Sequence, residues 1–332
     1  MNKKKIMFVL LAGLVMGACS SDDDGQVAQE PSQEQTQTPQ KSYPLSIEVA
    51  ENPMIQDGEE GSSSRRAAIT TGTTLNGFNM NYVYGEAAPG SLTATKTSEG
   101  QWTNSEGWPS DAVEGNPTVY WYASTSGTFN RTDDANKYPY INFTVEEAAA
   151  SQHDLLVATA SGTYSGTGGK LSFTFDHACS ALRFYVKKST NIDDKTLTVS
   201  SIVLKNVIKD GKYYYGTQSW TLGTTSTDYT LLNSSQTLAS DSYVLLNGSE
   251  DDSYLFLIPQ TLTAWNPSGA LSNTYLELTC TITDTRTSTQ VYSGTAYIPF
   301  NATFKKGTKY DVKINIGKNS LYSGPGTKII SD

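Results

Sequence analysis

The sequence has little of what enzymes and metal sites need. It holds two histidines, His153 and His177, and three cysteines in 332 residues. A zinc site or a Ser-His-Asp triad built on histidine would find few partners in such a chain. No Gly-x-Ser-x-Gly nucleophile elbow and no intact phosphate-binding loop occurs. We therefore expect structural roles for both histidines, no enzyme activity, no catalytic or metal-binding residues, and no cofactor.

Basic charge and helical patterns are also scarce. Lys and Arg number 24 against 33 Asp and Glu, which gives a net charge of −9 at pH 7 and a pI near 4.8. An acidic surface argues against nucleic acid as a partner. Amphipathic helix patterns are rare, whereas Thr, Ser, Gly and Tyr are abundant. This composition is typical of an all-β extracellular protein.

An apolar run near the start, Ile6 to Val15, is too short to cross a bilayer, which needs about 20 residues. Lys3–Lys5 precede it and Gly17-Ala18-Cys19 follow it, which is the layout of a secretory signal ending in a bacterial lipobox. We expect cleavage before Cys19, lipid on Cys19, and anchoring in the outer membrane. The acidic run Asp22–Asp24 resembles the export tag of Bacteroides-group surface lipoproteins, so the predicted location is the outer face of that membrane.

The other two cysteines are Cys179 and Cys280, and nothing in the sequence pairs them. An oxidising location would permit a disulfide between them. Cys280 alternates with Leu278 and Ile282 along an expected strand, so it is interpreted as a small core residue.

The pattern of strands and linkers predicts four parts. Residues 1–18 form the signal peptide, and residues 19–41 form the lipidated cysteine and a disordered tether rich in Gln, Glu, Ser, Thr and Pro. Short alternating strands such as Tyr43–Val49 and Leu171–Phe175 then recur between turn signals, which indicates β-sandwiches or barrels. We expect two in tandem, over residues 42–168 and 169–332, with the boundary at the Gly-rich segment 162–169.

Three local features give further expectations. The polar loop that ends in Arg65-Arg66 should be exposed to proteases. Asp210-Gly211, between two expected strands, predicts a β-hairpin. A group of aromatic residues is interpreted either as sandwich core or as a platform for carbohydrate: Tyr213, Tyr214, Tyr215, Trp220 and Trp265.

Several stretches together resemble the fimbrillin family, the Mfa-like and FimA-like proteins of Bacteroides-group surface pili. Beyond the lipobox, spacer and first strand, the resemblance is carried by Arg65–Thr70, Gln152–Ala158, Leu171–Ala178, Phe256–Gln260 and Gly307–Val312. It implies two transthyretin-like domains and a role as a structural or accessory subunit in fimbriae and adhesion. The implied partners are other fimbrial subunits, the outer membrane through the lipid, and surface glycans or proteins.

The resemblance also implies donor-strand exchange. An arginine-specific protease would cut between Arg66 and Ala67 and release a first strand that carries Leu45, Ile47 and Val49. A strand from the next subunit, the matching segment here being Lys328, Ile329 and Ile330, would fill the groove and extend a filament. This tail is short and poor in apolar residues, so a tip or anchor subunit, or a lipoprotein that is never cut, stays open. The alternative function is a surface glycan-binding lipoprotein outside pili.

Overall fold

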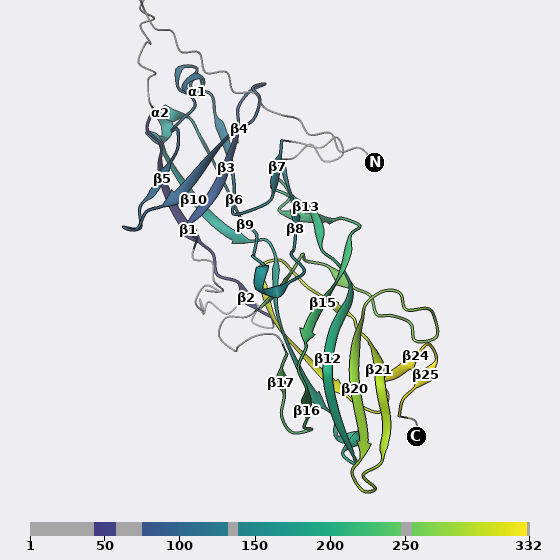
Figure 1. Cartoon of the computed structure of the whole chain (residues 1–332). Coiled ribbons are helices and arrows are strands. Elements are labelled where there is room, and N and C mark those ends of the chain that lie inside the picture. Colours follow the sequence, from purple (N-terminus) through teal and green to yellow (C-terminus); the bar gives the residue numbers. More distant parts are fainter. Residues whose placement is uncertain (1–42, 58–74, 132–138, 247–253, 331–332) are drawn as a thin grey trace, which may run out of the picture. The chain divides into compact units, whose positions relative to one another are not determined.

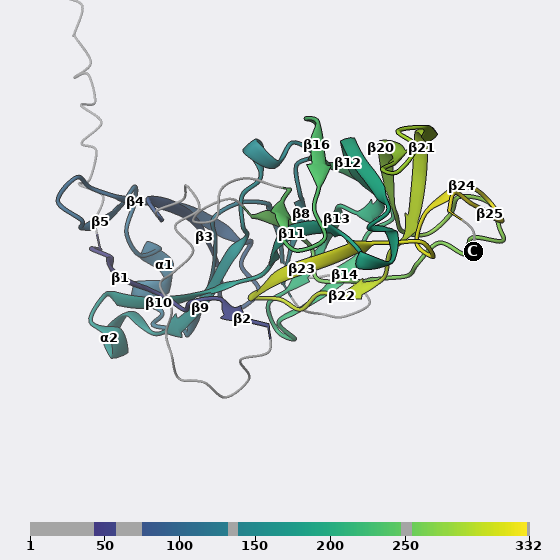
Figure 2. The same ribbon diagram turned by 90° about the horizontal axis from the view of Figure 1, so that it is seen from below.

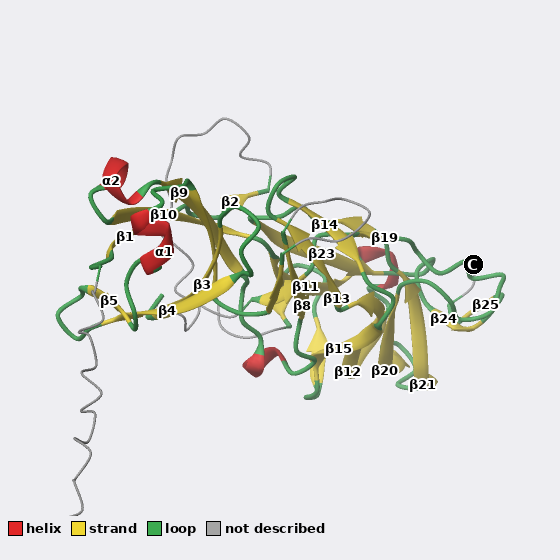
Figure 3. Ribbon diagram, turned by 90° about the horizontal axis from the view of Figure 1, so that it is seen from above, coloured by secondary structure: helices red, strands yellow, loops and turns green. Residues whose placement is uncertain are grey.

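Strands dominate the protein. The computed structural model describes residues 43–57, 75–131, 139–246 and 254–330 (Figure 1). Within these residues, helix is limited to α1 (Ser110–Glu114), α2 (Tyr164–Thr167) and two 3₁₀ turns, Ala149–Ser151 and Thr190–Ile192 (Figure 3). None of the described helices has the length and apolar character that crossing a membrane requires. The prediction of a mostly-β chain with several sheets is confirmed.

The first sheet joins strands from both ends of the chain's first half. Its strands lie in the order β1 (Ser46–Glu51), β10 (Lys170–His177), β9 (Leu156–Gly162), β6 (Val119–Ser124), β3 (Gly77–Val83), β4 (Gly90–Lys96) and β5 (Trp102–Asn104). In β10, Leu171, Phe173 and Phe175 are buried and the residues between them are more exposed. This alternation of apolar and polar residues is what fixes which face of a strand is buried.

Two further sheets form most of the remaining chain. One contains β17 (Val244–Leu245), β11 (Ser180–Lys188), β23 (Thr308–Ile316) and β2 (Ile55–Gln56), with β18 (Leu255–Leu257) also paired to β11. The other contains β15 (Ser226–Leu232), β12 (Lys195–Ile208), β20 (Tyr275–Asp284), β21 (Gln290–Pro299), β24 (Tyr322–Gly324) and β25 (Thr327–Lys328), with β16 (Gln236–Leu238) also paired to β12.

Smaller sheets complete the described fold and correct the hairpin prediction. One contains β14 (Ser219–Leu222), β13 (Asp210–Tyr214), β8 (Tyr140–Thr144) and β7 (Thr128–Asn130), and another pairs β19 (Thr261–Leu262) with β22 (Ala302–Thr303). Asp210-Gly211 lies inside β13, which pairs with β8 and β14 rather than folding back on β12. The Asp210 carboxylate instead accepts a hydrogen bond from the Thr225 amide at 2.9 Å, so it organises the turn after β14.

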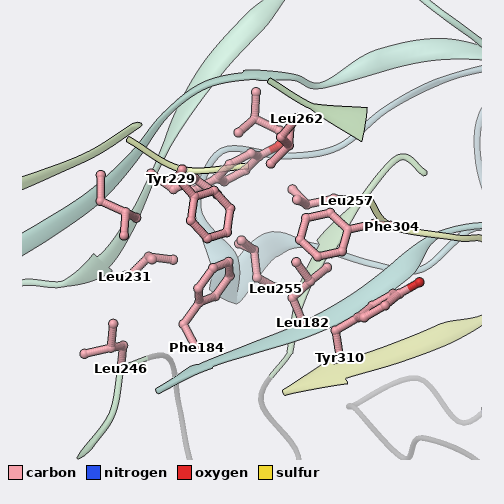
Figure 4. Close-up of a cluster of buried hydrophobic side chains, with 14 of the residues drawn as sticks. Leu182, Phe184, Tyr229, Leu231, Leu246, Leu255, Leu257, Leu262, Phe304 and Tyr310 are labelled. Carbon is pink, nitrogen blue, oxygen red and sulfur yellow. The ribbon is translucent and has the colours of Figure 1, made fainter. Parts of the chain in front are cut away.

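Buried apolar side chains gather in two clusters. The first cluster consists of Leu45, Ile47, Leu75, Phe78, Met80, Leu92, Ala94, Trp108, Ala112, Val119, Trp121, Ala123, Leu156, Ala158, Leu171, Phe173 and Phe175. The second cluster is larger, and Figure 4 shows part of it, including Leu182, Phe184, Tyr229, Leu231, Leu246, Leu255, Leu257, Leu262, Phe304 and Tyr310. Cys179 and Cys280 also belong to the second cluster, and both are buried free thiols.

The Gly-rich segment between β9 and β10 is a defined turn. The Thr163 hydroxyl accepts a hydrogen bond from the Gly166 amide, so it caps α2, and Gly168 ends the helix with a φ of 64°. Gly169, with a φ of 79°, leads directly into β10. β10 follows the predicted domain boundary at residues 168–169 but lies in the first sheet and contributes three residues to the first cluster. The boundary itself stays a prediction.

Candidate functional site

The first described strand, β1, and the residue just before it, Leu45, carry the side chains that the sequence marked as a displaceable strand. Leu45 and Ile47 are buried, with 8% and 7% of their surface exposed, and Val49 is half-buried against the first cluster. The side chains between them, Ser46, Glu48 and Ala50, are exposed. The inward face expected from the alternation is therefore present, while displacement of the strand stays a prediction. Cys19, Arg66 and Ala67 lie outside the described residues.

β1 lies at the edge of the first sheet and pairs with β10 alone among the described strands. The pairing is parallel and unbroken from Ser46 opposite Lys170 to Glu51 opposite Phe175 (Figure 2). On its other side, the segment has hydrogen bonds to β5 and to the residues that follow β5. The Asn104 side chain donates to the Leu45 carbonyl at 2.8 Å, and the Trp108 amide donates to the Tyr43 carbonyl at 3.0 Å.

A groove of about 710 Å³ follows β1. β1 forms one wall of this space through Ser46 to Ala50, and the other lining residues include the turn from Gly100 to Trp102 and Ser172 to Thr174 of β10. Beneath the strand, Phe78 packs against Phe175 and Trp102 at ring-centroid distances of 4.9 and 5.0 Å. β1 therefore lies over an aromatic floor, with alternate side chains directed into it.

Two glycines allow the backbone to approach the start of β1 closely. Gly107 has a φ of 88°, and a Cβ there would lie 2.3 Å from the Tyr43 carbonyl oxygen. Gly169 has a φ of 79°, and its Cβ would lie 2.7 Å from the Pro44 carbonyl oxygen. Because other residues rarely adopt such φ values and would also clash here, both positions require glycine. The Gly169 carbonyl in turn accepts a hydrogen bond from the Ser46 amide at 2.9 Å.

A buried ionic cluster lies at the other end of β1. His177 is 5% exposed at its side chain, and its Nδ1 lies 2.5 Å from Oδ2 of Asp154. Its Nε2 lies 3.3 Å from Oε1 of Glu51, the last residue of β1. The other oxygen of Asp154 accepts a hydrogen bond from the Cys179 amide at 3.2 Å. The histidine is therefore held between the carboxylate of Asp154, in the segment before β9, and the carboxylate of Glu51 in β1.

Protonation of His177 follows from this arrangement. Burial lowers its pKa, but the hydrogen bond to Asp154 and the negative charges of Asp154 and Glu51 outweigh burial and raise the pKa to about 9. The imidazole is thus cationic at neutral pH, which makes the contact with Glu51 an ion pair. Breaking one partner out of a buried pair is costly because the remaining charge is left uncompensated.

The segment after β1 continues into a different sheet. The Asn52 amide donates to the Phe175 carbonyl at 2.8 Å, and its side chain donates to Asp176 at 2.7 Å. Met54 is buried in the second cluster. β2 then pairs in parallel with β23, with Ile55 opposite Thr308. The stretch from Tyr43 to Asp57 therefore contributes to two sheets and to both clusters.

The candidate donor segment packs on its own chain. Lys328 lies in β25, and its Nζ donates to the Asn319 side chain at 3.0 Å. The Ile329 amide donates to the Leu321 carbonyl at 3.0 Å, and Ile329 and Ile330 are partly buried against the second cluster. The structure thus places this segment away from the β1 groove, in the sheet that contains β21 and β24.

The aromatic residues considered as a carbohydrate platform do not form an exposed row. Tyr213, Tyr214, Tyr215 and Trp265 are each less than 7% exposed. Trp220 is partly buried, and its indole N–H donates to the Ala178 carbonyl at 2.7 Å. The burial of these aromatic side chains supports their interpretation as core residues rather than as a carbohydrate platform.

The sequence did not reveal how Glu51, Asp154 and His177 converge. The histidine was assigned a structural role, and no spacing in the sequence links it to residues 23 and 126 positions earlier. Glu51 lies at an even spacing from Leu45, Ile47 and Val49. This spacing was a usable signal, because it places an acid on an otherwise apolar face of the strand. Among the described residues, no group of three or more His, Cys, Asp or Glu side chains is arranged to hold a metal ion.

Comparison with known proteins identifies the family. No curated protein sequence matches the chain. Among solved structures, the chain is similar to a fimbrial protein from Bacteroides vulgatus, with 16% identity, a TM-score of 0.49, and coverage of 82% of this chain and 95% of that one. It is also similar to the fimbrial anchor protein Mfa2 from Porphyromonas gingivalis, with 7% identity, a TM-score of 0.33, and coverage of 75% and 81%.

Neither structural likeness carries an argument at these scores. The sequence model of the fimbrillin-like family matches residues 68–329, which is most of the chain. This family is fimbrial and adhesive rather than enzymatic, and its members are associated with the cell surface. The chain therefore belongs to the fimbrillin-like family.

Proposed function

We propose that the protein is a structural or accessory subunit of surface fimbriae that joins its neighbours by donor-strand exchange. It would be exported as a lipoprotein through Cys19 and would consist of two tandem transthyretin-like β-sandwich domains over residues 42–168 and 169–332, with β10 completing the first sheet. After a cut between Arg66 and Ala67, the segment containing β1 would leave. A strand of another subunit would then take its place.

The observation that carries the proposal is the setting of β1. It is an edge strand with an alternating apolar face over an aromatic floor, and its main-chain pairing is with one described neighbour, β10. Full burial of an aliphatic side chain contributes about 1.5–3 kcal/mol. Loss of β1 would uncover the sites of Leu45, Ile47 and Val49 together with the free edge of β10. Such an edge is a template for another strand, which gives strand insertion its driving force.

The position of the proposed cut is compatible with release of the whole segment. The described strands of this segment end at β2, and the chain leaves the described region after Asp57. A cut after Arg66 lies C-terminal to both β1 and β2, so a single cleavage would free the whole segment from the rest of the chain. The main-chain bonds that hold it would then be the barrier to its release.

Limited digestion of the folded chain, residues 20–332, with an arginine-specific protease tests the proposal. Sequencing should show one new amino terminus at Ala67, and an unboiled denaturing gel should show a ladder of multimers that boiling abolishes. A variant with Arg65→Lys and Arg66→Lys keeps the charge and should yield neither. A cut without a ladder would indicate a tip or anchor subunit. Scattered digestion, or resistance at Arg66, would refute strand release.

The candidate donor segment is tested in the same assay. Ile329→Ser together with Ile330→Ser removes its apolar side chains, and these are only partly buried in the chain's own fold. If residues 328–330 are the donor, the variant should be cut normally and form no ladder. An unchanged ladder would show that another segment inserts.

A further inference from the structure

We propose that the position occupied by β1 against β10, called the β1 groove from here on, selects its occupant by charge, and that any strand taking this position must present a carboxylate to His177 at the place where Glu51 lies. This inference rests on the proposed function, because it assumes that the occupant is exchanged. It adds a chemical requirement to the apolar alternation: an inward acid two residues after the last inward apolar position.

The spacing of β1 supports this requirement. Leu45, Ile47, Val49 and Glu51 fall on one face at intervals of two residues, which is the period of a strand. Glu51 pairs with Phe175 in the parallel ladder, and His177 lies two residues further along β10 on the same face. The apolar face of the strand therefore ends in an acid that meets a cation of the neighbouring strand.

The hydrogen bonds of His177 leave one ring nitrogen for the occupant. Nδ1 is taken by Asp154, which is itself fixed by the Cys179 amide. Nε2 is buried, forms no hydrogen bond within the described residues, and has its ion-pair contact with Glu51 at 3.3 Å. A strand without an acid there would leave a buried, positively charged N–H with nothing to accept its proton, and such groups are costly.

Other charged groups near His177 do not substitute for Glu51. Asp176 is the preceding residue of β10, and its carboxylate accepts from the Asn52 side chain. Asp154 holds the opposite side of the imidazole ring. Burial lowers the pKa of Lys306, and the carboxylate of Asp176 is near enough to raise it in part. Lys306 brings a positive charge and not the negative one that His177 needs. The requirement for an acid therefore falls on the strand in the groove.

The same contact sets the register of the occupant. A parallel strand that slipped by two residues would keep its apolar face inward but would place Val49 or Pro53 opposite His177. Neither side chain accepts a hydrogen bond, so each slipped alignment leaves Nε2 of His177 without a carboxylate, while Nδ1 keeps Asp154. A single buried polar position that fixes alignment in this way is known from coiled coils.

A competition experiment tests the inference. The whole chain, nicked after Arg66, is incubated with an excess of two differently labelled peptides of residues 43–57, and the ratio incorporated is measured after gel filtration. One peptide has the natural sequence and the other carries Glu51→Gln. Glu51→Gln keeps an oxygen that can accept from Nε2 but removes the negative charge, so the peptide loses its ion pair with His177. Because the coupling of a close charge pair at an interface is worth about 1.5 kcal/mol or more, we expect the natural peptide to be preferred by roughly tenfold to a hundredfold.

The matched control is Glu48→Gln in the same peptide. Glu48 lies on the outward face of β1, where it pairs with Lys170 and accepts from Ser172 at the exposed surface. Its replacement should change incorporation by about threefold or less, because exposed ion pairs contribute little. A second arm uses nicked His177→Gln protein, which should lose the discrimination between the two residue-51 peptides.

The outcomes separate the inference from the proposed function. If the natural and Glu51→Gln peptides enter equally well, the charge requirement is wrong while strand exchange stands. If Glu48→Gln weakens entry as much as Glu51→Gln, net charge rather than His177 determines selection, and the inference is again wrong. If the nicked protein takes up none of the peptides, strand exchange in this groove fails, and the inference fails with it.

Discussion

Replacement of Ile47 by alanine should destabilise the protein by about 2–3 kcal/mol. Ile47 is 7% exposed and belongs to the first cluster, so the change removes three buried carbon atoms at about 0.8 kcal/mol each. Substitutions of this kind in closed cores cost about 2–5 kcal/mol once the cavity is included. The groove that follows β1 lets its surroundings relax, which places the expected value in the lower half of that range.

The measurement is urea denaturation at pH 7 followed by tryptophan fluorescence, because Trp108 and Trp121 lie in the same cluster as Ile47. Ser46→Ala, at the exposed neighbouring position, serves as the control and should change the free energy of unfolding by less than about 0.5 kcal/mol. Val49→Ala should fall between the two, because Val49 is only half-buried. A loss below about 1 kcal/mol for Ile47→Ala would show that its apolar burial does not hold β1 in place.

Two further predictions concern the two ends of β1. The pKa of His177 is raised from 6.5 to about 9, so its contribution to stability should be complete below pH 6.5 and should disappear as the pH rises through 9. In urea titrations, the free energy of unfolding should fall by about 3 kcal/mol between pH 6 and pH 10. His177→Gln should remove this fall, and His153→Gln should keep it. Equal curves for the wild type and His177→Gln would contradict the assignment. At the other end, Gly107→Ala should lower the free energy of unfolding by at least about 1 kcal/mol more than Gly100→Ala does. Both glycines have positive φ, but only at Gly107 would an added Cβ meet backbone, at Tyr43. Similar losses of unfolding free energy for both variants would show that the close approach to Tyr43 is unimportant.

Local patterns in the sequence predicted local structure well. The alternation in Leu45–Val49 and in Leu171–Phe175 correctly indicated strands with one buried face, because burial of every second side chain is a property of each strand by itself. Burial of Cys280 followed from the same reasoning. The family resemblance, which drew on short motifs along most of the chain, was confirmed by the family match.

Pairings between distant segments could not be predicted. Nothing in residues 46–51 specifies β10 as their partner, because main-chain hydrogen bonds are the same for every sequence. The hairpin expected at Asp210-Gly211 was wrong for this reason: both residues lie inside β13, whose partners β8 and β14 cannot be identified from the local sequence. Convergence of Glu51 and Asp154 on His177 likewise depends on the assembled sheet.

The parallel alignment of β1 with β10 has a mechanical consequence. The ladder runs unbroken from Ser46 to Glu51 and is extended by main-chain hydrogen bonds at both ends, from Ser46 to Gly169 and from Asn52 to Phe175. Tension applied along this strand loads all of these bonds together in shear, whereas a pull across the strand would break them one after another. A strand seated in this way therefore yields slowly to a lengthwise load, while it peels readily from one end.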